Sequence, residues 1–415
     1  MVGDHGEGLG DHDEDTHGIF LYDSTLHVPL LIKLPGELHA SVVVTAQVRT
    51  IDILPTILEL VGDPPLRKTD GESLEPYFAG ANESTRPAFG ETDYPLSFGW
   101  APLRSVRTEG FKYIEAPRPE FYDLGADASE LDNEYEPWND RVQKARGMLA
   151  KLRAQEPVPD SSVPIVKPET IDELTALGYV GPADRETTTT APQPSMLPDP
   201  KDNIEQQNLL HAAMIAEEDN RAKEAQESLA KVLILEPQSP IALRKLGELE
   251  LQAGNYAQAA QHLKGALEAH PDDATAAFWE GQAFAKLHDF LAARDALETS
   301  LRLWPKQLPA LLLLGDVDLS LLNPTDAEDE FNTALLLKPK SVQAKLGLAK
   351  AEIAERNFPE AARSLEKLSQ TDTENAAVFE TLAIAYTGSG KLIEAKRAMA
   401  RAQLIRQHAG RPTNQ

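Results

Sequence analysis

Small and large apolar residues recur every 34 positions along the second half of the chain, from about residue 203. Small residues let two antiparallel helices approach closely, and proline ends the second helix of a pair. The large apolar residue fills the space between neighbouring pairs. The spacing therefore predicts six helix pairs over residues 203–410. The columns are Pro237, Pro271, Pro305, Pro339; Gly247, Gly281, Gly315; Ala225, Ala259, Ala293, Ala327, Ala361, Ala395; and Leu229, Leu263, Leu297, Phe331, Leu365, Met399.

The first 180 residues show short apolar runs and one segment with helical periodicity. Residues 28–34 form an apolar run beginning Val-Pro that predicts a buried strand, and residues 42–44 are a second, β-branched run. In residues 48–62 the apolar positions fall on one face at helical spacing. Pro55 fits the first turn and Gly62 closes the helix. We expect this helix to pack on a sheet.

A hairpin and a spacer complete the pattern. The alternating runs 103–108 and 111–115 flank Glu109-Gly110 and predict two antiparallel strands joined by a tight turn. Residues 181–202 are rich in proline, threonine and serine, and such segments bury too little apolar surface to offset the entropy of ordering. We therefore expect an extended linker between two domains.

Composition narrows the possible functions. The chain has 415 residues and a net charge of −26, which argues against non-specific binding to nucleic acid or anionic membranes. There are no cysteines, so disulfides, thiolate zinc sites and a cysteine nucleophile are excluded. Because no apolar run reaches about 18 residues, we expect no membrane span. No signal peptide precedes Gly3, and the sequence does not identify the cellular compartment.

Candidate chemistry is concentrated in residues 1–17, which hold carboxylates and imidazoles but no lysine or arginine. Carboxylate and imidazole together are the usual ligands of divalent metals. A disordered acidic terminus is one interpretation. A calcium loop is excluded, because its sixth and twelfth positions would be Thr16 and Tyr22 instead of Gly and Glu. A fragment of an enzyme site is the third. The residues are Asp4, Glu7, Asp11, Asp13, Glu14, Asp15, His5, His12 and His17.

The segment from Asp4 to Gly36 resembles the sulfatase family of the alkaline-phosphatase superfamily. Asp4-His5-Gly6 matches the metal-binding turn of that family, and His17 lies twelve residues after His5, where the family has Lys or His. The Val-Pro strand follows in order. Further on, Lys-Tyr-Ile and Tyr-Asp-Leu runs resemble strands of the family's small C-terminal sheet. The resemblance covers residues 1–180 and implies the C-terminal portion of an α/β sheet plus a small antiparallel subdomain.

The resemblance also implies site roles. Asp4 and His5 would be metal ligands for calcium, or for zinc or manganese. His17 would be catalytic: it would contact sulfuryl or phosphoryl oxygens, act as an acid toward the leaving group, or bind a second metal. The implied substrate is a sulfate or phosphate ester. The family's nucleophile and first Asp pair are not found in this chain. We therefore expect it to begin inside a domain, and to hold metal and act only with the missing N-terminal half. Full-length relatives are often exported or membrane-anchored.

The 34-residue columns resemble the tetratricopeptide repeat, which implies an all-α solenoid with a protein or peptide ligand in its groove. A clamp for a C-terminal carboxylate, built from Asn and Lys, is not supported, since the expected first helices 240–253, 274–287 and 308–321 contain no Asn. The expected domains are 1–180, the linker 181–202, and 203–410. The alternative to an ester hydrolase or transferase is a non-enzymatic repeat scaffold that carries a remnant sulfatase domain.

Overall fold

The computed structural model describes residues 1–37, 42–64, 69–78, 86–154 and 196–409. The chain divides into two compact units. Of the described residues, the first unit holds those in 1–154 and 196–211, and the second holds those in 212–409. Most of the expected linker, residues 181–195, lies outside the described residues, and the three predicted domain boundaries stay a prediction. Among the described residues, no helix is both long and apolar enough to span a membrane.

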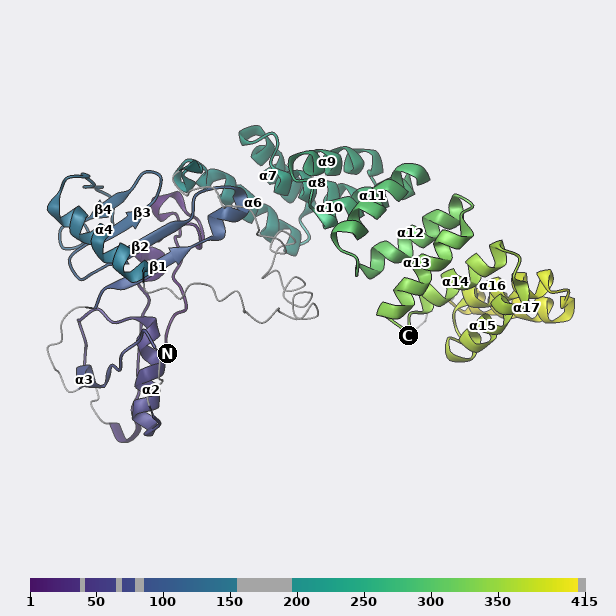
Figure 1. Cartoon of the computed structure of the whole chain (residues 1–415), viewed down its shortest axis with the longest axis horizontal. Coiled ribbons are helices and arrows are strands. Elements are labelled where there is room, and N and C mark those ends of the chain that lie inside the picture. The colour runs from purple at the N-terminus through teal and green to yellow at the C-terminus, as the bar shows by residue number, and fades with distance from the viewer. Residues whose placement is uncertain (38–41, 65–68, 79–85, 155–195, 410–415) are drawn as a thin grey trace. The chain divides into compact units, whose positions relative to one another are not determined.

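The first unit is built on a four-stranded antiparallel sheet in the order β1-β2-β3-β4 (Figure 1). Strand β2 pairs with β3 so that Arg107 lies opposite Lys112, which confirms the predicted hairpin. Helix α4 covers one face of the sheet, and its N-terminus is capped by the Asn139 side chain, which accepts a hydrogen bond from the Arg141 N–H. The elements are β1 Ala88–Thr92, β2 Leu103–Arg107, β3 Lys112–Glu115, β4 Glu120–Tyr122 and α4 Asp140–Arg153.

The alternation of the strands sends side chains into two separate cores. Val106 and Tyr113 pack with Val142 and other residues of α4. Their strand neighbours on the opposite face, such as Ile114, pack against residues 19–22, a fully buried aromatic and aliphatic segment. The sheet therefore lies between α4 and residues 19–22. Because these residues directly follow the acidic stretch of residues 1–17, they hold that stretch next to the sheet.

Two expectations for the first unit were wrong. Residues 28–34 form no strand beyond one isolated bridge, Val2 to Leu30, and Leu31 is 54% exposed. The predicted helix exists as α2 (Ile53–Val61), with Gly62 in the left-handed conformation that ends it, but it is not packed on the sheet with its apolar face buried. Its buried residue is Thr56, and Ile57 is 50% exposed. These apolar side chains have no covering partner among the described residues of the unit.

Shorter elements connect these parts. Helix α1 directly follows the buried 19–22 segment, and α3 lies beside α2. At the end of the expected linker, residues 198–202 pack on the first unit: the Ala101 N–H donates to Pro198 O, and Lys201 forms an ion pair with Glu120. The bounds are η1 Asp11–Asp13, α1 Asp23–Leu26, η2 Pro35–Glu37, η3 Thr50–Asp52, α3 Glu75–Phe78, η4 Tyr94–Phe98 and η7 Pro200–Asp202.

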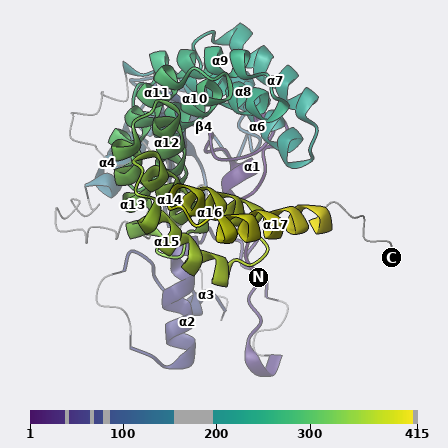
Figure 2. The same cartoon turned by 90° about the vertical axis from the view of Figure 1, so that its right-hand side faces the viewer.

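The second unit is a series of antiparallel helix pairs (Figures 1 and 2). Helix α6 begins in the first unit and ends in the second. The helices are α6 Ile204–Glu218, α7 Ala222–Leu235, α8 Pro240–Ala253, α9 Tyr256–Ala269, α10 Ala274–Lys286, α11 Phe290–Leu303, α12 Leu308–Ser320, α13 Pro324–Leu337, α14 Val342–Ala354, α15 Phe358–Thr371, α16 Ala376–Gly388 and α17 Leu392–Ala409. The predicted first helices agree with α8, α10 and α12.

The periodic columns occupy the contacts between helices, as predicted. The alanines of the Ala225 column are buried, and so is the large apolar column from Leu229 to Leu365. At Gly247, an added Cβ would lie 2.5 Å from the Leu263 Cγ, which is closer than real side chains approach. The glycine column therefore sets how closely the two helices of a pair can pack.

The carboxyl of Glu352 on α14 is buried in this array, and its Oε2 has no hydrogen-bond partner among the described residues. Burial, together with the carboxylates of Glu360 and Glu328, raises its pKa to about 7. The folded state therefore holds this proton more tightly than the unfolded chain does. Its contribution to stability is full below the ordinary pKa near 4.5 and is lost as the pH rises through 7.

We therefore expect Glu352→Gln to raise the stability of the helical array at pH 8 by about 1 to 3 kcal/mol, and to change it little at pH 5. Thermal unfolding followed by circular dichroism at the two pH values measures this. Glu394→Gln, on the exposed surface of α17, is the control, and its effect on stability should be the same at both pH values. An equal gain for Glu352→Gln at both pH values would contradict the account.

Candidate metal centre

The acidic stretch at the N-terminus is held in place by its backbone. Gly6 N–H donates to Thr25 O at 2.8 Å and Gly8 N–H to Thr16 O at 2.6 Å. Both glycines are required by close approach: a Cβ on Gly6 would lie 2.1 Å from Ser24 O, and one on Gly8 would lie 2.2 Å from Glu14 O. The loop between His5 and His17 therefore folds back on itself and on the start of α1.

This fold brings His5, Glu7 and His17 together. One ligand atom from each lies within 4.8 Å of the others. The two imidazole rings stack with centroids 3.7 Å apart, and His17 Nδ1 lies 3.1 Å from both carboxylate oxygens of Glu7. All three side chains are partly exposed, so a ligand can reach them from solvent. Two imidazoles and a carboxylate form a donor set that suits a divalent transition metal.

The three residues singled out from the sequence are placed differently. His5 and His17 are neighbours, although eleven residues separate them. Asp4 is not part of the group: its side chain is 93% exposed, and its Oδ2 lies 3.9 Å from His5 Nε2. Glu7 was not singled out as a ligand. Its signal was its position two residues after His5, because alternate residues of an extended segment face the same side.

A buried carboxylate supports the turn that carries His17. Glu14 is almost fully buried and accepts a hydrogen bond from the Ile19 N–H at 2.8 Å, with Phe20 N–H nearby. Burial raises the pKa of Glu14 to about 7, and the two backbone N–H groups oppose this rise. The contact joins the acidic loop to residues 19–22, which pack on the sheet.

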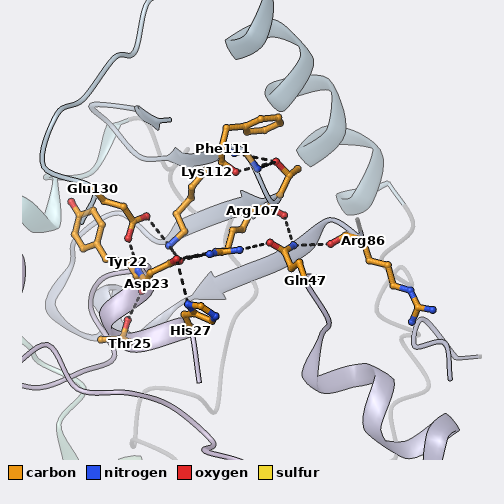
Figure 3. Close-up of polar contacts among 12 residues, drawn as sticks. Tyr22, Asp23, Thr25, His27, Gln47, Arg86, Arg107, Phe111, Lys112 and Glu130 are labelled. Atoms are coloured by element: carbon orange, nitrogen blue, oxygen red, sulfur yellow. Dashed lines mark hydrogen bonds and ion pairs between the residues drawn. The ribbon is translucent and has the colours of Figure 1, made fainter. Parts of the chain in front are cut away.

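An ion cluster centred on Asp23, at the start of α1, attaches the segment that follows the acidic loop to the sheet (Figure 3). Lys112 Nζ on β3 lies 2.6 Å from Asp23 Oδ1 and 2.8 Å from Glu130 Oε1. Arg107 on β2 donates from Nε and from its terminal nitrogen to Asp23 at 2.7 to 3.0 Å, and it also contacts Gln47. The Asp23 N–H donates to Glu130.

The charges in this cluster are mutually dependent. Lys112 is 0% exposed, and Glu130 is almost as deeply buried. Burial alone would raise the pKa of Asp23, but hydrogen bonds from Arg107 and the charge of Lys112 outweigh burial and lower it to about 2. Burial raises the pKa of Glu130, although Lys112 opposes the rise. Asp23 is therefore ionised at neutral pH, and its ion pairs hold α1, and with it the His17 segment, against the sheet.

The fold and the site together define a two-part protein: a small sheet unit that carries a carboxylate–imidazole loop, and an array of helix pairs. Residues 15–155 match the family model of the C-terminal part of N-sulphoglucosamine sulphohydrolase. The ranges 210–274, 249–308 and 312–377 match the tetratricopeptide repeat. This chain thus joins the C-terminal portion of a sulfatase-family domain to a tetratricopeptide array, as its sequence predicted.

Individual proteins are similar to parts of this chain. The multifunctional alkaline phosphatase superfamily protein PehA of Trinickia caryophylli is 34% identical over 151 residues, which cover 32% of this chain and 29% of that protein. Arylsulfatase K of Gallus gallus is 30% identical over 163 residues, covering 37% and 30%. A solved tetratricopeptide repeat protein from Parabacteroides merdae is 24% identical, covers 50% of this chain and 81% of that chain, and superposes with a TM-score of 0.45.

The matched part spans less than a third of the length of these curated relatives. The sulfatase relatives imply a metal-dependent family. The tetratricopeptide repeats indicate binding of a protein or peptide.

Proposed function

We propose that residues 4–17 supply one side of a sulfatase-type metal site, which is completed by the remainder of a longer sulfatase domain. The convergence of His5, Glu7 and His17 carries this proposal. Their loop is joined through Glu14 and Asp23 to the sheet that matches the sulfatase C-terminal part. The proposed substrate is a sulfate or phosphate ester, and the repeat array would bind a protein or peptide.

The apolar surface of the first unit supports an incomplete domain. Leu31 and Ile32 in the 28–34 run, and Leu54 and Ile57 on α2, are each more than two-fifths exposed. Isolated exposed leucines are ordinary, but several large apolar side chains exposed in one small unit indicate surfaces that another part covers. Because the relatives are more than three times longer than the matched part, their remaining sequence is the natural candidate to cover it.

The donor set also limits which metal ion the proposed site would bind. Calcium prefers six to eight oxygen ligands, whereas His5 and His17 offer imidazole nitrogens. Zinc or manganese fits two imidazoles and one carboxylate better. Asp4 is close enough to His5 to join the ligand set after a side-chain rotation. A bound metal would supply positive charge to the ester oxygens, and His17 would be one of the ligands that hold it there.

Metal titration tests the site independently of turnover. With zinc chloride in a calorimeter, we expect the chain to bind weakly, with Kd on the order of 10 to 100 µM, because the ligand set is partial. His5→Ala and His17→Ala should each weaken binding at least ~10-fold. His288→Ala, in the repeat array, is the control. Equal affinity for all four proteins would refute a site at residues 5–17.

Turnover separates the enzyme from the scaffold. We expect no hydrolysis of 4-nitrophenyl sulfate by this chain alone, because no nucleophile signature occurs in it. Hydrolysis should appear when the preceding part of a sulfatase domain is supplied by co-expression, and should be lost in His17→Ala. If metal binds but co-expression never restores turnover, the non-enzymatic scaffold becomes the better account of the chain.

A further inference from the structure

Inside the helix array, each groove between the two helices of a pair is covered by the first helix of the next pair. Helix α14 contacts both α12 and α13, and α16 contacts both α14 and α15. The contact is apolar: Leu365 and Leu368 of α15 are buried in one cluster with Val378 and Leu382 of α16. Each groove therefore accommodates an amphipathic helix.

The groove between α16 and α17, the last pair in the array (Figure 2), is covered by none of the described residues. It is an open groove of about 590 Å³, with a lining that is almost entirely apolar. Met399 shows how this groove differs from a covered one. It is 39% exposed, whereas Leu365, which is 34 residues earlier in the same column, is 1% exposed. The lining includes Ala383, Ile384, Leu392, Ala395, Lys396 and Met399.

The lining of this groove holds one cation, Lys396, and no acid, although the whole chain has a net charge of −26. Helix α17 carries four cations against a single acid, Glu394, but two of the cations are already paired: Arg401 with Glu374, and Arg406 with Glu380 on α16. Lys396 stands in the lining itself, where the preceding repeat has an alanine. A second copy of this groove would therefore bring another Lys396 and no carboxylate of its lining to this one. A helix with carboxylates beside its apolar stripe would pair with Lys396 instead.

We propose that the α16–α17 groove binds an acidic amphipathic helix from a partner protein. The partner helix takes the position that a seventh first helix would occupy. It presents apolar residues at i, i+3 and i+4 to Met399 and Ile384, and a carboxylate to Lys396. The proposal does not depend on the sulfatase-type site.

The test uses a synthetic peptide of residues 372–390, which contains the α16 sequence and the acids Asp372, Glu374 and Glu380. In the array this helix covers the equivalent groove one pair earlier. With a fluorescent label, its binding to the full chain is measured by anisotropy. Met399→Asp should weaken binding at least ~10-fold, because it puts a charge in the apolar centre. Lys396→Glu should weaken it ~5-fold, and a peptide with both glutamates changed to lysine should reverse that preference.

Leu336→Asp is the control, because Leu336 is also exposed but lies on α13, away from the groove, and it should bind the peptide as the original chain does. Absence of saturable binding, or equal binding by Met399→Asp, would overturn the proposal. Light scattering that shows a dimer lost in Met399→Asp would assign the groove to a second copy instead. Much tighter peptide binding after removal of residues 410–415 would assign it to the chain's own tail.

Discussion

Asp23→Asn should destabilise the first unit by about 3 to 5 kcal/mol, the cost of leaving a buried charge without its partner. Lys112 cannot turn to solvent, because it is fully buried on β3, and Glu130 would be its single remaining anion in the cluster. Arg107 would also lose a two-point contact. The cluster would then carry two cations and at most one anion in a buried place, which favours separation of α1 from the sheet.

Hydrogen exchange followed by mass spectrometry measures this effect locally, so the helix array does not obscure it. Amides of β2 and β3, and of residues 19–26, should exchange faster in Asp23→Asn. Asp93→Asn is the matched control, because Asp93 pairs with Arg104 at 2.6 Å on the same sheet but is largely exposed. Its cost should stay below about 1 kcal/mol. Similar protection losses in both variants would show that the Asp23 cluster is an ordinary surface contact.

The same cluster predicts a milder effect for Lys112→Met. Asp23 would keep Arg107 as its partner, and Glu130, whose pKa is already raised by burial, would take up a proton. A neutral cluster with an apolar side chain in place of lysine costs little.

The pH dependence of the stability of the first unit follows from Asp23. Its carboxylate stabilises the fold above the ordinary pKa near 3.8, and this contribution is lost as the pH falls through about 2.

The parts of the fold that repeat or alternate could be predicted from the sequence, because their contacts are local or periodic. The 34-residue columns identified the helix pairs, and the Glu109-Gly110 turn identified the hairpin. Residues 28–34 were not predictable in the same way. Their composition suits a strand, but a strand forms only where a neighbour supplies hydrogen bonds, and the described residues supply one bridge, between Val2 and Leu30.

The candidate site was predictable in part. His5 and His17 were found through the spacing of a known motif, and that spacing does bring their rings together. The cluster that anchors them was missed, because Asp23 lies 89 residues before Lys112 and 107 before Glu130. No periodicity connects such residues. A lysine within an apolar strand run was the only sequence signal, and it indicates a buried partner without identifying it.

Gly347→Ala should destabilise the helix array by about 1 to 3 kcal/mol, although alanine is usually the better helix former. The reason is the ring of Phe331, which is buried between Gly315 on α12 and Gly347 on α14. A Cβ on Gly347 would lie 2.3 Å from one ring carbon and 2.4 Å from another, and the closely packed ring has no space into which it can move. The columns agree: where Leu297 or Leu365 replaces the phenylalanine, the position matching Gly347 holds Leu313 or Thr381.

Phe331→Leu should relieve this clash, so a double-mutant cycle tests the packing. Phe331→Leu alone should cost about 1 kcal/mol through the cavity it leaves, and the double variant should be more stable than the sum of the single costs by about 1 to 2 kcal/mol. Thermal unfolding followed at 222 nm compares the four proteins. Gly265→Ala on α9 is the control, because its Cβ would meet Leu243 at an ordinary 3.4 Å, and it should be neutral or stabilising. Additive costs in the cycle would mean that Gly347 is required by something other than the Phe331 ring.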